Sequence, residues 1–471
     1  LWSTIKAVNR RLRAKFSTLW EALCNKIRIF IRINDNQIGN MNRIYTLIAV
    51  VALSLTAAFS LSARGVILGD EQFSSYLPEL QGKKVAVFSN KSGVVGDKVL
   101  KGKGLPLDGP KKFGPHLVDV LLRKKVNVSV IFSPEHGFRA DADAGEHVSS
   151  STDPQTGVEI VSLYGNSGRP SAEDAEKFDV LLVDIQDVGL RFYTYYVTMY
   201  RLMDFCADYG RKVIVLDRPN PNGFYVDGPI LDMDYKSGVG ALPIPVVHGM
   251  TLGELALMIN GEGWLKDGKK CQLSVVTCRN YTHQTKYQLI MPPSPNLKTM
   301  RAVYLYPSTC LFEGTVVSLG RGTDHPFEMY GSPDMKLFSY RFMPKSMPGA
   351  KKPDYQDEWC YGVNLSESDV DRICARGIDL NYIINAFSML TSFPGASTHE
   401  GILPDGRHFF GKKPYFDKLM GNSWVRELIM QGLAAEDIKV RWPPDAEKFT
   451  AHRCPYLLYE EIYSFVQQDF V

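Results

Sequence analysis

Between residues 128 and 139 the chain reads Val128-Ser129-Val130-Ile131-Phe132-Ser133-Pro134-Glu135-His136-Gly137-Phe138-Arg139, and this stretch decides the fold. Its first half predicts a buried strand, and its second half is a short loop with a carboxylate, an imidazole and a guanidinium. Charged groups at the end of a buried strand must be solvated, paired or used in chemistry. The loop is therefore either an internal Glu–His–Arg network or part of a functional site.

The surrounding chain repeats this pattern, with apolar runs separated by helices. Helices are expected at about residues 115–125, 171–177, 193–209 and 252–260. Continuous apolar runs are typical of parallel strands that are buried on both faces. The pattern predicts a doubly wound α/β fold built on a parallel sheet. The predicted strands are Lys84–Phe88, Val126–Phe132, Val180–Val183, Val213–Leu216 and Ile244–Val247.

Beyond about Cys271 the periodicity weakens. A strand is expected at residues 359–365, and helices are expected at 366–376 and 380–390, which indicates a second, smaller α+β domain. The segment Pro292-Pro293-Ser294-Pro295-Asn296 would join the two parts. We therefore expect a catalytic α/β domain at residues 64–275 and a C-terminal domain at residues 276–471.

The first 63 residues have the composition of a leader. Residues 1–40 hold eight Lys or Arg against two acidic residues, and Met41 begins a secretory-type pattern with an apolar core at 44–59. That core is shorter than the ~20 residues of a comfortable membrane span. Residues 41–63 are therefore expected to be a signal peptide that leaves no stable membrane span, which predicts a periplasmic or secreted protein. Residues 1–40 are interpreted as upstream translation, with a membrane-associated basic helix as the alternative.

Composition and missing motifs exclude several classes of function. After the leader the net charge is −4, which argues against nucleic-acid binding. The chain has no G-x-G-x-x-G after the first strand, no G-x-x-x-x-G-K-[ST], no G-x-S-x-G, no H-E-x-x-H and no zinc-type cysteine spacing. We expect neither a cofactor nor a metal.

Polar side chains follow every predicted strand of the sheet. In open α/β sheets, ligands bind outside the carboxyl ends of the strands. Carboxylates, arginines, amides and aromatic rings at such an edge indicate a carbohydrate site. The candidate substrate-binding residues are Asn90, His136, Arg139, Arg191, Tyr193, Asp217, Arg218, Asn220, His248, Asn296, Glu313 and Arg321.

Three carboxylates are candidates for catalysis. Glu135 is the expected general acid, because partial burial beside Pro134 would raise its pKa toward the working pH. Asp184 and Asp187 are candidates for the second carboxylate, because strands lie ~4.8 Å apart and glycosidases use carboxyl groups roughly 5–9.5 Å apart. Both aspartates also fit as caps of their own loops, and Asp217 with Arg218 also fits as an internal ion pair.

Six motifs in order resemble the exo-β-N-acetylmuramidases of the NamZ type, once a family of unknown function. The resemblance runs from about Gly65 to Tyr459. One departure is Val316-Val317-Ser318, where a more polar stretch is expected. The motifs lie at 133–138, 184–195, 217–221, 292–296, 306–315 and 320–323.

The resemblance implies a Rossmann-like domain, a smaller C-terminal domain and an active site in the cleft between them. It also implies release of N-acetylmuramic acid from the non-reducing end of peptidoglycan fragments, with Glu135 at the position of the family's S-P-E-H-G glutamate. This sugar carries a lactyl carboxylate, which a guanidinium can hold bidentately. Arg139, Arg191, Arg218 and Arg321 are the candidates for that contact, and Arg321 is favoured.

Two other classes of function stay open. A periplasmic sugar- or muropeptide-binding protein would use the same aromatic rings and arginines without turnover. A metal-dependent cell-wall amidase or deacetylase would need His136, His147 or His248 to converge with carboxylates. Replacing Glu135 separates a hydrolase from a binding protein, and a chelator tests the metal-dependent class.

Overall fold

The computed structural model describes residues 65–96, 114–134, 137–139, 151–163, 168–392, 394, 397, 400–411 and 414–461. The predictions for residues 1–40 and 41–63 lie outside these ranges. Seven strands form one sheet in the order β3-β4-β2-β1-β5-β6-β9. All neighbours run parallel except β3, which pairs antiparallel with β4. The strands are β1 (Lys84–Ser89), β2 (Asn127–Ser133), β3 (Ser151–Thr152), β4 (Glu159–Ser162), β5 (Val180–Asp184), β6 (Lys212–Leu216) and β9 (Gln272–Val276).

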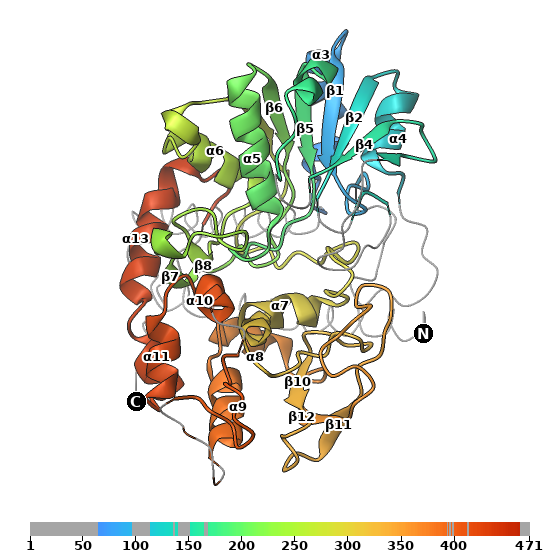
Figure 1. The fold of residues 1–471 in the computed structure, drawn as a ribbon. Coiled ribbons are helices and arrows are strands. Elements are labelled where there is room, and N and C mark those ends of the chain that lie inside the picture. The colour runs from blue at the N-terminus through green and yellow to red at the C-terminus, as the bar shows by residue number, and fades with distance from the viewer. Residues whose placement is uncertain are drawn as a thin grey trace, which may run out of the picture. The chain divides into compact units, whose positions relative to one another are not determined.

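Both faces of this sheet are covered by helices, which confirms the predicted α/β class. In β1, Val85 and Val87 join one buried cluster, whereas Ala86 and Phe88 join another. The first cluster includes side chains of α3 (Phe73–Leu80) and α4 (Leu117–Arg123), and the second includes side chains of α5 (Tyr195–Asp208) and α6 (Leu252–Gly261) (Figure 1). Alternate residues of one strand thus enter different cores, so the strand reads as a continuous apolar run.

The helices predicted for this part are present. Those expected at 115–125, 193–209 and 252–260 are α4, α5 and α6, and the one at 171–177 is the 3₁₀ helix η3 (Glu173–Lys177). Thr251 caps α6, because its hydroxyl accepts from Glu254 N at 3.3 Å and the Glu254 carboxylate accepts from Thr251 N at 2.9 Å. This reciprocal capping box satisfies two backbone donors at the start of the helix.

The predicted strand at 244–247 is wrong as a member of the parallel sheet. β8 (Pro245–Val247) pairs antiparallel with β7 (Asp227–Ile230) in a separate two-stranded sheet. Pro243 and Pro245 have no backbone N–H, so this short run offers few donors to a central ladder position. The parallel neighbour of β6 is β9, which follows α6 along the chain.

The C-terminal part is a small antiparallel sheet with several helices. β12 lies between β10 and β11, and the elements predicted at 359–365, 366–376 and 380–390 are β12, α8 and α9. One buried cluster extends from α5 and α6 to side chains such as Phe312, Phe387 and Trp442, so this part shares a core with one face of the large sheet. The elements are α7 (Met300–Thr309), η6 (Cys310–Gly314), β10 (Met329–Ser332), β11 (Tyr340–Phe342), β12 (Cys360–Asn364), α8 (Val370–Arg376), α9 (Asn381–Thr391), α10 (Tyr415–Met420), α11 (Trp424–Met430), α12 (Ala435–Lys439) and α13 (Pro443–Arg453).

The segment after α13 returns to the α/β part. The Arg453 guanidinium donates to Gly249 O, and the Tyr459 hydroxyl donates to Asp217 Oδ2 at 2.6 Å. The Leu458 N–H donates to Glu254 Oε1 at 2.8 Å. These bonds join residues about 200 positions apart at the end of β6 and the start of α6. Within the described ranges, no helix has the length and apolarity needed to cross a membrane.

Candidate active site

The carboxyl ends of β1, β2 and β5 lie level with one another. Ser89 pairs in register with Asp184, and Phe88 pairs with Phe132, so Ser133 stands beside Ser89. All three polar side chains are fully buried. The loops after these strands therefore start from one edge, which we call the sheet rim.

Glu135 and His136, the first choices from the sequence, lie outside the described residues. Their neighbours are described: Gly137 N donates to Pro134 O at 3.2 Å, and the buried Phe138 ring packs edge-on against His116 at 4.7 Å between centroids. Because β1 separates β2 from β5, the strand ends that precede Glu135 and carry Asp184 are ~10 Å apart.

Asp184, at the end of β5, belongs to a buried ion cluster. The Arg218 guanidinium donates from Nε to Asp184 Oδ1 at 2.7 Å and from a terminal nitrogen to Asp70 Oδ2 at 2.8 Å. A terminal nitrogen also donates to Val94 O at 3.2 Å. Asp70 and Asp184 are fully buried, and Arg218 is 4% exposed. Asp184 Oδ2 has no hydrogen-bond partner within the described part of the chain.

Asp187 presents a second carboxylate three residues further on. Its Oδ1 accepts from Gly189 N at 2.7 Å, and Oδ2 is buried with no partner among the residues that the structure describes. Burial raises the pKa of Asp187 to about 7, against the lowering effect of the Gly189 N–H. Gly189 has a φ of +78°, and a side chain there would overlap the Asn220 amide. The loop geometry thus requires glycine at this position.

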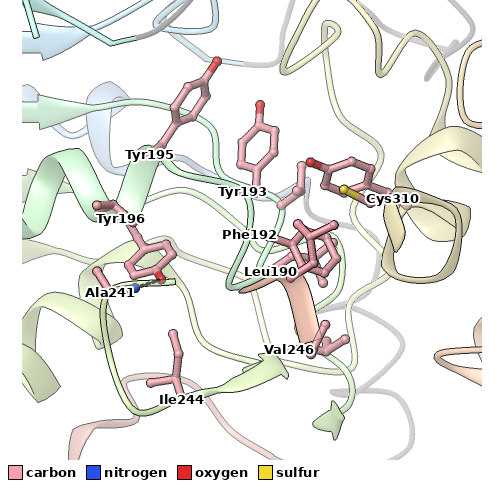
Figure 2. Close-up of a cluster of buried hydrophobic side chains, with 14 of the residues drawn as sticks. Leu190, Phe192, Tyr193, Tyr195, Tyr196, Ala241, Ile244, Val246 and Cys310 are labelled. Atoms are coloured by element: carbon pink, nitrogen blue, oxygen red, sulfur yellow. Dashed lines mark hydrogen bonds between the residues drawn. The ribbon is translucent and has the colours of Figure 1, made fainter. Parts of the chain in front are cut away.

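An amide and two tyrosines organise the neighbouring loops. Asn90 Nδ2 donates to the Tyr195 hydroxyl at 2.8 Å, and the Tyr195 and Tyr193 hydroxyls both reach Pro293 O, at 3.1 and 2.9 Å. The two rings meet edge to face with centroids 4.7 Å apart (Figure 2). The loop after β5 is therefore bonded to the segment 292–296, and Asn296 in that segment donates to Gly349 O at 2.8 Å.

Aromatic rings continue from this point to the C-terminal ion pair. Tyr306 lies 6.1 Å from Tyr193 and 4.8 Å from Phe327 between ring centroids, and the Arg321 guanidinium lies 5.1 Å from the Phe327 ring. Arg321 donates to Glu313 Oε1 at 2.6 Å. The side chains of this pair are 27% and 22% exposed, so both groups keep access to solvent.

Four of the proposed substrate-binding residues are engaged inside the fold. Asp217 accepts from the Thr251 hydroxyl, Gly253 N and Tyr459, which anchors the start of α6, and burial raises its pKa to about 6. Asn220 donates to Met250 O at 2.9 Å.

Arg191 and His248, the other two, are completely buried. The Arg191 guanidinium donates to Pro229 O, Ile244 O and Leu419 O at 2.8, 2.8 and 3.0 Å. The His248 ring accepts from Met250 N at 3.2 Å, and burial lowers its pKa to about 3. The local sequence gives no sign of either placement.

Arg139 forms a different kind of contact, bridging two carboxylates. It donates to Asp119 at 2.6 Å and to Asp153 at 2.8 Å, and its side chain is 20% exposed. This pairing ties the loop after β2 to α4 and to the residues that follow β3.

Sequence reasoning missed Asp70 and His116. Asp70 lies in the 3₁₀ helix η1 (Gly69–Glu71), far along the chain from the motifs, and no local pattern marks it. His116 accepts from Val118 N through Nδ1 at 3.2 Å, so its proton sits on Nε2, which donates to Asn90 O at 2.8 Å. In the structure His116 is the N-cap of α4, whereas the sequence predicts a helix from about residue 115, so the local pattern did not mark its role.

The sequence of this chain is similar to that of known proteins over most of its length. Residues 108–301 match the family model for the N-terminal part of the exo-beta-N-acetylmuramidase NamZ, and residues 304–459 match its C-terminal part. The chain is 35% identical over 408 residues to the peptidoglycan beta-N-acetylmuramidase NamZ of Bacillus subtilis, covering 83% of this chain and 90% of that protein. The chain belongs to the NamZ exo-β-N-acetylmuramidase family. The protein is therefore a glycosidase.

Two solved structures of DUF1343 family proteins from Bacteroides fragilis share the fold. One is 51% identical with a TM-score of 0.73, covering 85% of this chain and all of that one. The other is 26% identical with a TM-score of 0.67, covering 84% of this chain and 99% of that one. The expected resemblance to the NamZ family is confirmed.

The surroundings of the candidate site residues separate those that hold the fold together from the rest. Among the described residues, no group of three His, Cys, Asp or Glu side chains has the arrangement of a metal site. Arg191 and His248 hold the fold together, and Asp217 anchors α6. The described candidates without such a structural role are at the sheet rim and in the Glu313–Arg321 pair, and Glu135 and His136 lie outside the described residues.

Proposed function

We propose that this NamZ-family protein hydrolyses peptidoglycan fragments from the non-reducing end and releases N-acetylmuramic acid. The match of both family models across residues 108–459 carries the proposal. The 35% identical relative from Bacillus subtilis is named a peptidoglycan beta-N-acetylmuramidase, which supports the same substrate here.

Two carboxyl groups perform the reaction in this proposal. Glu135 gives its proton to the glycosidic oxygen as the C1–O bond breaks. A water oxygen forms the new bond to C1, and Asp187, the second carboxylate on the opposite face of the sugar, accepts the proton that this water loses. Two observations favour Asp187: its Oδ2 has no partner in the described chain, and its raised pKa of about 7 suits proton exchange near neutral pH. Asp184 is bonded to Arg218, so in this proposal it positions the sheet rim and is not the second catalytic carboxylate.

We assign the lactyl carboxylate of the muramic acid to Arg321. Arg191 is fully buried, Arg218 contacts two carboxylates, and Arg139 is likewise held by two. Arg321 contacts the single carboxylate of Glu313 and keeps 27% of its side chain exposed. A planar guanidinium can bind a second carboxylate through its remaining N–H groups.

The activity is tested with a chromogenic β-glycoside of N-acetylmuramic acid. The wild-type protein is expected to release the chromophore and free N-acetylmuramic acid. Glu135→Gln should lower kcat by about 10²-fold or more while the substrate still binds. Asp371→Asn is the matched control, because this carboxylate is exposed and pairs only with the surface residue Lys286. Binding without turnover by the wild-type protein would favour the sugar-binding class.

The lactyl contact is tested by comparing two substrates. Arg321→Ala should lower kcat/KM for the N-acetylmuramic glycoside by about tenfold to a hundredfold, and it should have little effect on the N-acetylglucosamine glycoside, which lacks the lactyl group. Arg376→Ala is the control, because the Arg376 side chain is 46% exposed and its partner is Asp379, three residues further along the chain. Equal losses on both substrates would remove Arg321 from this role.

We also propose that the reaction takes place in the periplasm or outside the cell. The support is the secretory-type pattern at residues 41–63. Fractionation of cells that produce the full coding region, with N-terminal sequencing of the exported protein, tests it. An intact protein retained in the cytoplasm would contradict it.

A further inference from the structure

The carboxylate of Asp70 reaches the sheet rim from outside the motifs that mark this family's sequence. It lies in η1, which packs directly on the carboxyl ends of β6 and β9. A side chain at Gly69 would lie 2.5 Å from both Asp217 N and Val276 O, so only glycine allows this close approach. Gly69 N donates to Asp217 O at 3.0 Å, which fixes η1 in place. This packing places the Asp70 carboxylate within hydrogen-bond distance of a terminal nitrogen of Arg218.

Charge counting within this cluster shows an imbalance. Asp70 and Asp184 are fully buried and share one guanidinium, that of Arg218. If both were ionised, the cluster would carry a net negative charge without solvent, which is costly in a buried site. Burial raises the pKa of Asp70 to about 8; Arg218 opposes the rise, and Asp184 and Glu71 add to it.

Among the described residues, Arg218 is the cation that the structure places on Asp70. The charged and titratable groups that face the cluster come from η1, α3, α4 and the strand ends: Glu71, Tyr76, His116, Asp184 and Arg218. His116 is neutral, because Val118 N donates to its Nδ1 and burial lowers its pKa. The Tyr76 hydroxyl donates to Asp70 O at 2.9 Å.

We propose that Asp70 is a positioning residue of this active site. It carries a proton and accepts a hydrogen bond from a terminal nitrogen of Arg218, so that the positive charge of the guanidinium acts on Asp184 alone. Arg218 then contacts the Asp184 carboxyl through Nε and the Asp70 carboxyl through its terminal nitrogen. Asp184 keeps Oδ2 directed away from this contact, and that oxygen lies about 3.1 Å from the position that a side chain would take at Gly93, at the start of the rim loop.

The inference rests on the proposed function, because Asp184 matters to turnover only if the sheet rim is the active site. Loss of the Asp70 proton at alkaline pH adds a negative charge beside Asp184. That charge competes with Asp184 for the Arg218 guanidinium, which bonds to both carboxyl groups. The contact that positions Asp184 is weakened, so kcat/KM falls as the pH rises through the pKa of Asp70.

The pH profile of Asp70→Asn tests the inference. Asparagine keeps the shape of a protonated aspartate and cannot ionise. Wild-type kcat/KM should fall about tenfold between about pH 7 and about pH 9, and in Asp70→Asn this fall should shrink to about twofold or less. Asp371→Asn is the matched control and should keep the wild-type profile. An alkaline fall of the same size in Asp70→Asn would overturn the inference.

A second measurement does not depend on turnover. Infrared difference spectra between about pH 7.5 and about pH 9.5 should show loss of a protonated-carboxyl C=O band in the wild-type protein that is missing from the spectra of Asp70→Asn. If the two proteins lose bands of equal size, the signal comes from another carboxyl group, and the inference fails even though the enzyme is active. If the wild-type protein has no muramidase activity and the band is still lost, the proposed function fails and the buried proton stands.

Discussion

Arg191→Met should lower the free energy of unfolding by about 3 kcal/mol. The guanidinium is fully buried and donates to three backbone carbonyls, those of Pro229, Ile244 and Leu419. Within the described chain no carboxylate is bonded to it, and burial lowers its pKa to about 10. Methionine has a similar length and would remove this donor from the Pro229 and Leu419 carbonyls, whereas Ile244 O would keep the Leu231 N–H at 3.1 Å.

The magnitude follows from two opposing terms. Each buried carbonyl left without a donor costs about 1–3 kcal/mol, so Pro229 O and Leu419 O together cost about 2–6 kcal/mol, and loss of the second bond to Ile244 O adds about 1 kcal/mol. Removing the guanidinium also removes its desolvation penalty, which is several kcal/mol. The difference favours arginine by about 3 kcal/mol, because the acceptors come from three segments that the guanidinium holds together.

Urea unfolding followed by tryptophan fluorescence measures this change. Arg191→Lys should fall between wild type and methionine, because one ammonium group cannot match the planar geometry of three acceptors. Lys345→Met is the control and should cost less than about 1 kcal/mol, because both side chains of its ion pair with Asp357 are more than half exposed. A stability of Arg191→Met within about 1 kcal/mol of wild type would mean that desolvation cancels all three bonds, and the reasoning would be wrong.

Three further outcomes are expected. Asp187→Asn should lower kcat by about 10²-fold or more, because the carboxylate must be ionised to act. It should also remove the rise in kcat/KM that the wild type shows as the pH increases through about 7. The pH–rate profiles of the two proteins measure both effects. The free energy of unfolding should fall as the pH rises from about 4 to about 8. In the folded protein the pKa values of Asp70, Asp187 and Asp217 are raised to about 8, 7 and 6, so these carboxyl groups hold protons that the unfolded chain has released. Urea unfolding at several pH values measures the sign, and a rise would contradict the prediction. Tyr195→Phe should cost about 1 kcal/mol and speed proteolytic cleavage near Pro293, because one of the two phenol donors to that carbonyl is lost; an unchanged cleavage rate would refute the link.

The α/β fold could be predicted because its signal is local. Val85 and Val87 face one core while Ala86 and Phe88 face the other, so a strand buried on both sides is apolar throughout. The prediction failed at Ile244–Val247, where the apolar run is equally clear. Strand membership there depends on which partner offers matching donors and acceptors, and the prolines direct β8 to β7.

The same distinction between local and long-range signals applies to the site residues. The loops that carry Asp187 and Asn90 could be placed at the rim, because residues that follow parallel strands share one edge. Whether a polar side chain in such a loop points to solvent or into the fold depends on segments far along the chain. Arg191 is engaged by Leu419, and Asp217 is engaged by Tyr459, contacts that span 228 and 242 positions.

The bond between Tyr459 and Asp217 has a consequence for biosynthesis. Asp217 leaves the ribosome 242 residues before Tyr459, an interval of about 10 to 50 seconds at ordinary rates of translation. During this time the end of β6 and the start of α6 lack the phenol and the backbone donor of Leu458 that complete them. The nascent chain thus cannot complete the packing at the end of β6 and the start of α6 until Tyr459 has been synthesised.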